Sequence, residues 1–285
     1  MIFFISDGRL GNQLFQYAFL KTVAKKNERI IVLNMNKLLD VMEVHNEKFI
    51  NMNCNKYLFF LFRSIVTRCF FRLSIKLRLI SYIKQDRNKT SALPYYKKIT
   101  GLLPFTYVET DFFQSEKFFD LDKLDFEIKK KYVDNAKIFM NSMPKEATPA
   151  FVHVRRGDYV YEKYLDSRGI DLPLTYYSKA MSIIETHVTN PFYIFLTDDK
   201  EFVRCCFKHI TNKIISNNDE GTDLAIMSLC EYGICANSSF SWWGAYLMKN
   251  RKLVIFPKYW YGWKQKVESH IDIQPSWAKI IEVES

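Results

Sequence analysis

Two adjacent arginines that directly follow an apolar stretch have the clearest chemical potential in this 285-residue sequence. Residues 151–154 (FVHV) are typical of a buried strand, and Arg155, Arg156, Gly157 and Asp158 come next. Parallel sheets bind their ligands beyond the carboxyl ends of strands. Guanidinium groups stay charged and suit a diphosphate, so fixed arginines can stabilise a departing diphosphate in place of Mg²⁺. The alternative is a structural Arg–Asp pair that ends the strand.

The glycine turn at residues 7–13 (DGRLGNQ) is a second candidate for anion binding. Gly8 and Gly11 would let the backbone approach a ligand, and the helix expected after them offers free N–H groups. An ordinary turn between a strand and a helix explains the same residues equally well.

A third candidate combines Asp223 with the polar run Asn237, Ser238 and Ser239. The run stands at an expected helix start, where hydroxyl and amide groups can meet a phosphate. A carboxylate such as that of Asp223 can accept the two N–H donors of a guanine edge. Ordinary helix capping is the alternative interpretation of the serines.

The carboxylate pair Asp198 and Asp199 at the end of an expected strand invites a metal interpretation. We expect the pair to line the site or to cap a helix at 200–206, because the arginines already serve the phosphate. No His cluster and no CxxC pair has zinc-ligand spacing. The sequence therefore predicts neither a metal ion nor a cofactor.

Strands and helices alternate along the chain in an order that would position these groups. This order predicts an α/β fold of two Rossmann-like domains that face a cleft, 1–147 and 148–285, with a polar, proline-containing stretch before the second. Trp242 and Trp243 favour core packing. The expected strands are 2–6, 30–33, 150–154, 192–197, 233–236 and 253–256, and the expected helices are 12–25, 175–187, 222–232 and one from about 239.

Composition narrows the class of protein. Hydrophobic residues make up 48% of the chain, enough for a packed interior, and the net charge of +10 indicates an anionic partner. The six cysteines fit free, mostly buried thiols in a reducing compartment. Residues 1–6 are too short for a signal peptide, and no apolar run reaches the roughly 20 residues of a membrane span. We therefore expect the protein in the cytoplasm.

The segment 57–89 is basic and rich in large apolar residues, with no acid before Asp86. Its spacing puts Arg63, Arg68, Arg72 and Lys76 broadly on one helical face, so a basic helical insertion near 56–98 is expected. Two interpretations stay open. The segment is either a solvated face of a domain helix or a membrane-surface helix whose phenylalanines reach the acyl boundary.

Four motifs together resemble the α-1,2-fucosyltransferase family of bacteria and animals. They are GRLGNQLFQYA at 8–18, HVRRGDYV at 153–160, FLTDD at 195–199, and the run 223–244 that ends in NSSFSWWG. The resemblance implies a GT-B architecture with the acceptor half first and the GDP-fucose half second. It also implies an inverting, metal-independent reaction that moves L-fucose from GDP-fucose to the 2-hydroxyl of a galactose-terminated oligosaccharide.

The resemblance also implies roles for single residues. Arg155 matches the arginine that contacts the β-phosphate, His153 and Asp223 match residues against the guanosine, and Ser239 stands sixteen positions after Asp223, as the guanine and phosphate contacts of related enzymes do. Asn12 matches an asparagine that faces the sugar and diphosphate. The predicted donor-binding set is therefore Asn12, His153, Arg155, Arg156, Asp223, Ser238 and Ser239.

The general base and the exact reaction stay open. Asp158 is the default base by position, Glu162 is the second candidate because related enzymes have a glutamate near this distance, and a reaction without a protein base is the third. The alternatives in function are another linkage, another GDP-sugar, or a non-catalytic basic protein that binds membrane or nucleic acid. The last leaves HVRRGD and NSSFSWWG unexplained, so we expect no nucleic acid but a peripheral contact with the anionic inner face of the cytoplasmic membrane, where bacterial relatives often modify lipid-linked oligosaccharides.

Overall fold

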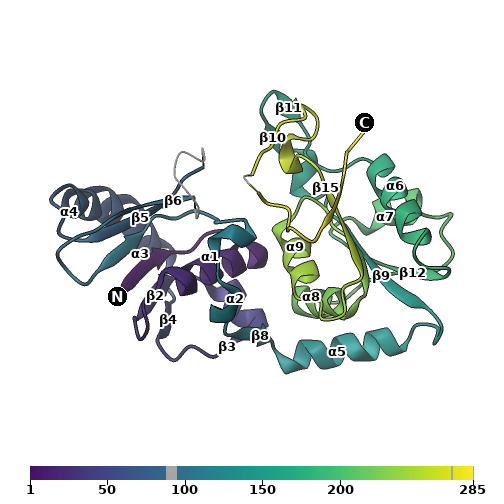
Figure 1. Ribbon diagram of the computed structural model, residues 1–285, viewed down its shortest axis with the longest axis horizontal. Coiled ribbons are helices and arrows are strands. Elements are labelled where there is room, and N and C mark those ends of the chain that lie inside the picture. Colours follow the sequence, from purple (N-terminus) through teal and green to yellow (C-terminus); the bar gives the residue numbers. More distant parts are fainter. Residues whose placement is uncertain (88–94, 271, 285) are drawn as a thin grey trace. The chain divides into compact units, whose positions relative to one another are not determined.

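The computed structural model describes residues 1–285 except 88–94, 271 and 285, and it divides into two compact units, Met1–Glu127 and Ile128–Ser285 (Figure 1). The predicted boundary at 147/148 lies later, because helix α5 (Lys130–Asn141) packs on helix α8 (Glu220–Leu229) of the second unit. A side chain at Gly221 would stand 2.7 Å from the ring of Tyr132, so this glycine lets the two helices approach.

The first unit is built on a six-stranded sheet with the order β4-β2-β1-β7-β5-β6. Its pairs are parallel except for the β5–β6 edge. From β1 the chain moves outward to β2 and β4, and it then places β5, β6 and β7 on the other side of β1, so the strand connections change direction between β1 and β7. The strands are β1 (Ile2–Ile5), β2 (Ile30–Leu33), β4 (Phe49–Met52), β5 (Ser81–Gln85), β6 (Tyr96–Ile99) and β7 (Thr106–Val108).

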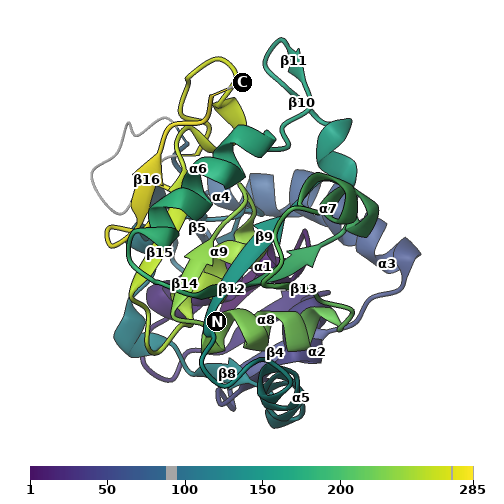
Figure 2. The ribbon, with the colours of Figure 1, turned by 90° about the vertical axis from the view of Figure 1, so that its right-hand side faces the viewer.

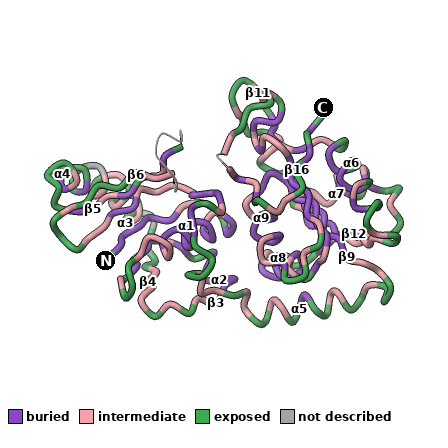
Figure 3. Tube along the Cα trace, viewed as in Figure 1, coloured by how far each residue is buried: buried purple, intermediate pink, exposed green. Residues whose placement is uncertain are grey.

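Both faces of this first sheet are covered, because successive residues of a strand point to opposite faces. On one face Phe4 lies beside Phe113, which stacks on Phe19 of helix α1 (Leu10–Val23) with ring centroids 3.8 Å apart. On the other face Phe3 packs on the helical segment that begins at residue 56. Buried residues accordingly follow β1, most of β2 and most of α1, whereas β4 and β6 are intermediate or exposed (Figure 3). The remaining short elements are α2 (Asn36–Val41), β3 (Met42–Val44) and β8 (Phe126–Ile128).

The predicted basic insertion near 56–98 is helical only in its first part. It runs from α3 (Lys56–Leu61) through a π-helix (Phe62–Phe71) to α4 (Arg72–Lys76). Arg78 then takes a left-handed conformation with φ 54°, which ends the helix, and the chain enters β5 of the sheet. The insertion prediction was wrong in its second part because the alternating apolar residues after Arg78 are typical of a strand.

The second unit has a six-stranded, all-parallel sheet with the order β13-β12-β9-β14-β15-β16. Helices α6 and α7 lie on one face and α8 and α9 on the other (Figure 2). Strand connections reverse between β9 and β14. The strands are β9 (Thr148–Val154), β12 (Pro191–Thr197), β13 (Lys213–Ile215), β14 (Tyr232–Ile234), β15 (Leu253–Pro257) and β16 (Lys279–Ile281), and the helices are α6 (Leu174–Glu185), α7 (Lys200–Cys206) and α9 (Ser239–Tyr246). A short hairpin is formed by β10 (Lys163–Tyr164) and β11 (Ser167–Arg168).

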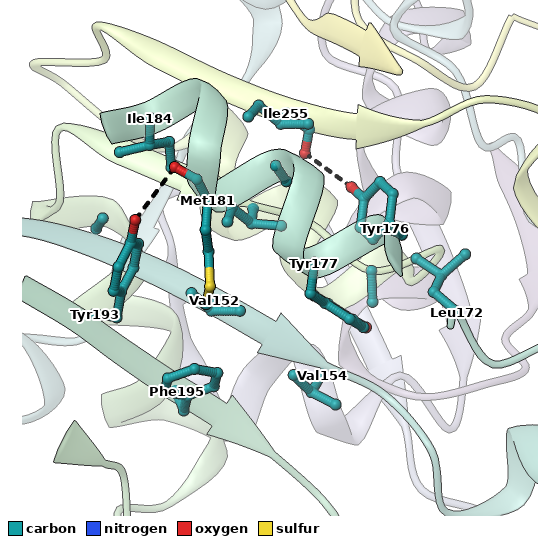
Figure 4. Packing of buried hydrophobic residues seen from close by; sticks show 14 of the residues in the cluster. Val152, Val154, Leu172, Tyr176, Tyr177, Met181, Ile184, Tyr193, Phe195 and Ile255 are labelled. Atoms are coloured by element: carbon teal, nitrogen blue, oxygen red, sulfur yellow. Dashed lines mark hydrogen bonds between the residues drawn. The ribbon is translucent and has the colours of Figure 1, made fainter. Parts of the chain in front are cut away.

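The core beneath α6 fixes how β9 presents its side chains. Val152 lies beneath Met181 and Val154 beneath Tyr177 of α6, and the Tyr176 hydroxyl lies 3.4 Å from the carbonyl of Ile255 (Figure 4). The Tyr176 hydroxyl also donates to the carbonyl of Cys235 at 2.7 Å. The strand period of two then turns His153 to the opposite face, toward α8 and α9.

Other sequence expectations concern single residues. Trp242 and Trp243 are fully buried, and Trp242 donates its indole N–H to the carbonyl of Ile273 at 2.6 Å, which confirms core packing. The six cysteines are free, but only Cys230 and Cys235 are buried. Within the described residues, no helix is long and apolar enough to cross a membrane.

Candidate functional site

The switch point of the second sheet gathers most of the predicted site residues. Arg155 and Arg156 directly follow β9, and Asn237 to Ser239 follow its parallel neighbour β14. The two adjacent strands thus deliver both polar runs to the same edge of the sheet. This is where open α/β sheets bind ligands.

Arg155 is held between two carboxylates. It forms ion pairs with Asp158 and, at 2.8 Å, with Asp198, and its guanidinium lies 5.2 Å from the ring centre of Tyr159. The Arg–Asp pair considered from the sequence therefore exists. The guanidinium nitrogens Nη1 and Nη2 of Arg155 already face carboxylates. A diphosphate would therefore have to displace at least one of these carboxylates to bind in a bidentate manner.

Arg156 has a more enclosed set of partners. Its Nη1 atom lies 2.8 Å from a carboxylate oxygen of Asp171, and its Nε atom lies 3.3 Å from a carboxylate oxygen of Asp199. Its guanidinium stacks on Phe202, 3.8 Å from the ring centre. These contacts connect the end of β9 to α7 and to the loop before α6. Arg156 therefore braces the site in this structure.

Asp198 and Asp199 serve the arginines and a helix end. Asp199 accepts from the backbone N–H of Phe202 at 3.0 Å and caps α7, which confirms the expected capping at residues 200–206. Asp198 accepts from the backbone N–H of Arg156 at 2.9 Å. A side chain at Gly157 would stand 2.5 Å from Asp198, so only glycine lets this carboxylate lie against the loop. In the described part of the chain, no three His, Cys, Asp or Glu side chains are grouped to hold a metal ion.

His153 is a buried, neutral imidazole on the α9 side of the sheet. Its burial, with a smaller contribution from the charge of Arg155, lowers its pKa to about 3. Its ring meets the ring of Phe240 edge-on at 5.6 Å, and its Nδ1 atom has no hydrogen-bond partner among the described residues. A neutral ring nitrogen can exchange a hydrogen bond with an uncharged part of a ligand at any ordinary pH.

Asp223 lies in the first turn of α8, where Asp219 caps the helix by accepting from the N–H of Thr222 at 2.8 Å. Burial raises the pKa of Asp223 to about 7, although a hydrogen bond from Ser216 acts in the opposite direction. Ser216 is buried and directly follows β13. Sequence reasoning missed it, and its position after a short apolar strand was the only available signal.

In the polar run after β14, Ser238 and Asn237 make hydrogen bonds within the second unit. Ser238 caps α9 by accepting from the N–H of Phe240 at 3.4 Å, as the capping alternative expected. Asn237 is fully buried and donates to the carbonyl of Ile170 at 2.6 Å. Its side-chain oxygen has no partner in the described part of the structure. Ser239 follows in the first turn of α9 and is partly exposed.

The family profile for glycosyl transferase family 11 matches residues 1–281. The chain belongs to glycosyl transferase family 11. This confirms the resemblance stated from the four motifs.

The names of three curated relatives refer to O-antigen biosynthesis, to α-1,2-colitosyl transfer and to α-1,2-fucosyl transfer. The O-antigen biosynthesis glycosyltransferase WbnK of Escherichia coli is 26% identical and covers 96% of this chain and 98% of its own. An α-1,2-colitosyltransferase of Escherichia coli is 28% identical, with 96% of each chain covered. The rat galactoside α-(1,2)-fucosyltransferase 1 is 29% identical over 34% of this chain and 27% of its own.

Solved structures support the fold of the family 11 chain. A family 9 glycosyl transferase from Veillonella parvula superposes with a TM-score of 0.52 at 11% identity, covering 99% of this chain and 86% of that one. The ADP-heptose lipopolysaccharide heptosyltransferase II of Escherichia coli gives 0.51 at 10% identity, covering 99% and 90%. The predicted GT-B-like α/β fold of two units is confirmed, whereas the cleft between them stays a prediction.

Two predicted residues lie outside the arginine cluster. Asn12 is in the first turn of α1 in the first unit, where its side-chain oxygen accepts from Gln114 at 2.7 Å. Gly8, at φ 84°, lies against it, and a side chain there would stand 2.4 Å from its amide. Glu162 is exposed just before the β10–β11 hairpin. The donor contact of Asn12 and the choice among Asp158, Glu162 and no protein base stay predictions.

Sequence reasoning also missed a tyrosine pair that closes one side of the site. The hydroxyl of Tyr159 lies 3.0 Å from that of Tyr261 and 3.3 Å from the carbonyl of Asn237. Burial raises the pKa of both tyrosines, so both remain protonated donors. Tyr261 is far away in sequence, and no motif indicated it.

Proposed function

We propose that this family 11 protein transfers L-fucose from GDP-β-L-fucose to the 2-hydroxyl of a terminal β-galactoside, with inversion to an α-1,2 linkage. The main support is the second unit, where Arg155 and the neutral His153 at the switch point and Asp223 in the first turn of α8 offer partners for a diphosphate, a nucleoside and a guanine edge. The rat relative is named as a galactoside α-(1,2)-fucosyltransferase, which favours this acceptor.

In the proposed reaction the acceptor oxygen attacks C1 of fucose while the bond from C1 to the β-phosphate oxygen breaks. GDP departs with the electron pair, and the acceptor hydroxyl loses its proton. Arg155 stabilises the departing charge when it exchanges an aspartate for the diphosphate. If the diphosphate replaces Asp158, that carboxylate is released from its ion pair and can take the proton of the acceptor hydroxyl. Glu162 and a reaction without a protein base remain the alternatives.

The donor set also predicts a preference for guanine. An ionised Asp223 can accept two hydrogen bonds from the guanine N1–H and its exocyclic amine, whereas adenine presents no such pair of donors. The buried carboxylate is poorly solvated, so an unmatched base would leave it without compensation. Arg156, Ser238 and Ser239 are proposed to support the phosphates. No metal ion enters this mechanism.

GDP-colitose is a second candidate donor, to be compared directly with GDP-fucose. The α-1,2-colitosyltransferase matches 96% of this chain, so transfer of colitose is the alternative within the same linkage. We would measure rates with GDP-fucose and with GDP-colitose on lactose. Faster turnover of GDP-fucose supports the proposal, and turnover of GDP-colitose alone contradicts it. Tight binding of a random oligonucleotide at physiological salt, without GDP binding, would favour the non-catalytic alternative.

We further propose that the protein contacts an anionic membrane through the helical segment 56–76 and the turn beside it. Phe60 and Phe70 are 68% and 63% exposed. Backbone hydrogen bonds from Leu102 and Leu103 to residues 78 and 79 bring an exposed leucine turn next to the segment. The exposed basic residues of this face are Arg72, Lys76 and Arg78.

The contact surface differs from the one expected from the sequence. Phe59 and Phe62 are partly buried against the first unit's core, and Phe71 belongs to that core. Arg63 pairs with Asp7 at 3.0 Å. The side chain of Arg68 lies outside the described residues. The outward apolar side chains with basic neighbours and no acid remain typical of an interfacial helix, and O-antigen synthesis by a relative favours the inner face of the cytoplasmic membrane.

A further inference from the structure

The first unit has a hollow at the carboxyl edge of its own sheet. The cavity, of about 240 Å³, lies between the π-helix and the strands β1, β5 and β7. Ile5 ends β1 and Glu109 follows β7, so the hollow sits at the switch point of this sheet. Thr110 donates to the carbonyl of Ile5 at 2.8 Å and ties the two strand ends together. The polar and aromatic lining residues are Arg63, Thr67, Arg72, Tyr82, Tyr107, Glu109 and Thr110.

A second hollow adjoins the first. It has a volume of about 410 Å³, and Glu109 and Thr110 line both. Its other walls come from the end of β5 and the two residues after it, from Lys97 of β6, and from Asp111. Ligand pockets for drug-sized molecules span roughly 300–1,000 Å³, so the smaller hollow suits one sugar ring and the pair suits two.

Several of the charged side chains around the two hollows form ion pairs. Arg63 pairs with Asp7 at 3.0 Å, and Lys84 pairs with Glu109 at 3.1 Å. In the second hollow Arg87 forms a two-point ion pair with Asp111. Arg72 and Lys97 also line the hollows, so basic side chains outnumber acidic ones there. The charged and hydroxyl groups together offer many hydrogen-bond donors and acceptors, which suits a ligand with several hydroxyls.

The walls also suit the apolar faces and the hydroxyl groups of a sugar ring. Tyr82 and Tyr107 stack with centroids 6.0 Å apart and form an aromatic surface beside the polar groups. Glu109 supplies two acceptor oxygens for sugar hydroxyls. Partial burial and then the charge of Asp111 raise the pKa of Glu109, while Arg72 acts in the opposite direction.

We propose that the smaller hollow binds the terminal β-galactose of the acceptor, with Glu109 accepting hydrogen bonds from its hydroxyls, and that the adjoining hollow holds the next sugar. This inference rests on the proposed function, because the second unit is assigned to the nucleotide donor. A transferase needs a site for its second substrate. The hollow lies at the switch point of the first sheet, the same position at which the second sheet holds the proposed donor residues.

The test compares Glu109→Gln, which keeps the shape of the side chain, with Glu43→Gln, an exposed acid elsewhere in the first unit. With lactose and GDP-fucose, Glu109→Gln should raise the acceptor KM at least about tenfold while the donor KM and thermal unfolding stay unchanged. Saturation-transfer NMR with methyl β-galactoside, without donor, should lose its signal in Glu109→Gln and in Tyr82→Ala but keep it in Glu43→Gln.

Three outcomes would overturn the inference, and one would contradict only the proposed donor. An unchanged acceptor KM and NMR signal in Glu109→Gln would place the galactoside elsewhere. Equal increases in donor and acceptor KM, with a lower unfolding temperature, would assign Glu109 a structural role. If the wild type does not turn over GDP-fucose but binds the galactoside through Glu109, the proposed donor fails and the inference about this hollow stands. Absence of galactoside binding in the wild type contradicts the inference itself.

Discussion

Arg155 and Arg156 have the same charge but different surroundings. Arg156 is stacked on Phe202 and joined to two aspartates of neighbouring elements, so it holds the site together. Arg155 bridges Asp158 and Asp198 within the loops that a ligand would approach. Of the two, Arg155 is better suited to exchange a carboxylate for a diphosphate.

Substituting Arg155 by lysine should therefore separate charge from shape. Lysine keeps the positive charge but loses the two-point fork, so kcat should fall by about 10²-fold or more. Steady-state kinetics measure this, with circular dichroism to verify the fold and Arg204→Lys, an exposed arginine on α7, as the control. A folded Arg155→Lys enzyme with wild-type kcat would mean that the diphosphate binds elsewhere.

Asp223 should make GDP binding dependent on pH. Its pKa is raised to about 7, and only the ionised carboxylate can accept both guanine donors. Below this pKa, GDP binding requires loss of the proton, so Kd should rise as pH falls from about 8 to about 6, by up to roughly tenfold per unit at the lower end. Isothermal titration calorimetry at several pH values measures it.

Asp223→Asn is the matched variant, because it retains the shape and removes the titration. Any pH trend that comes from the diphosphate of GDP will persist in Asp223→Asn, and the difference between the two proteins isolates the carboxylate. Parallel curves for wild type and variant, with equal affinity, would leave Asp223 as a residue of the α8 N-terminus only.

At the residue scale, the sequence predicted which groups gather but not how they pair. Arg155, His153 and Asp158 follow from one motif at the end of a strand. The partner of Arg156 at Asp171 and the bond from Ser216 to Asp223 join positions from different loops, so they depend on the completed fold. The raised pKa of Asp223 likewise results from burial, which no local spacing indicates.

At the scale of elements, Asp199 joins α7 to the site, together with the stacking of Phe202 on Arg156. Asp199 caps the helix with one oxygen and pairs with Arg156 through the other. Asp199→Ala removes both contacts and should lower the free energy of unfolding by about 1–2 kcal/mol, whereas Asp199→Asn keeps a capping oxygen and should lose less. Urea unfolding measures both, with Glu201→Gln on the same helix as the control.

Equal stability of Asp199→Ala and the wild type would show that the cap contributes nothing measurable. A metal-ligand role would give a different pattern, in which Asp199→Asn retains stability but makes turnover depend on added divalent cations.

Elements with a strong local signal were predicted well. The strand 30–33 was predicted with its observed bounds, and 192–197 and 253–256 each miss one residue. Helix α5 was missed because it is amphipathic and mostly exposed, so its sequence looked like the polar end of a domain. The edge strand β6, with its two lysines, was missed because it has little apolar signal of its own.

For the whole molecule, the exposed apolar face of the first unit predicts reversible membrane binding. The protein should sediment with phosphatidylglycerol vesicles at low salt and dissociate as salt rises, since each basic residue contributes roughly 1 kcal/mol near an anionic surface. Replacing Leu73, Leu77 and Leu102 by serine should weaken binding about fivefold or more.

Ile138→Ser is the control for this experiment, because Ile138 is equally exposed on α5 of the second unit. If the leucine variant and the control both sediment like the wild type, the leucine face is not the contact. A wild-type protein that stays in the supernatant at low salt contradicts membrane binding altogether.

The central claim is that this family 11 protein transfers fucose to a galactose 2-hydroxyl, with fixed arginines in the role of a metal ion. The most direct measurement is incubation of the purified protein with GDP-fucose and lactose in EDTA, followed by NMR of the product. We predict an α-1,2-linked fucose on galactose, formed at the same rate with EDTA as with added Mg²⁺ or Mn²⁺. A product with another linkage, or activity that chelation abolishes and a divalent cation restores, would contradict the account.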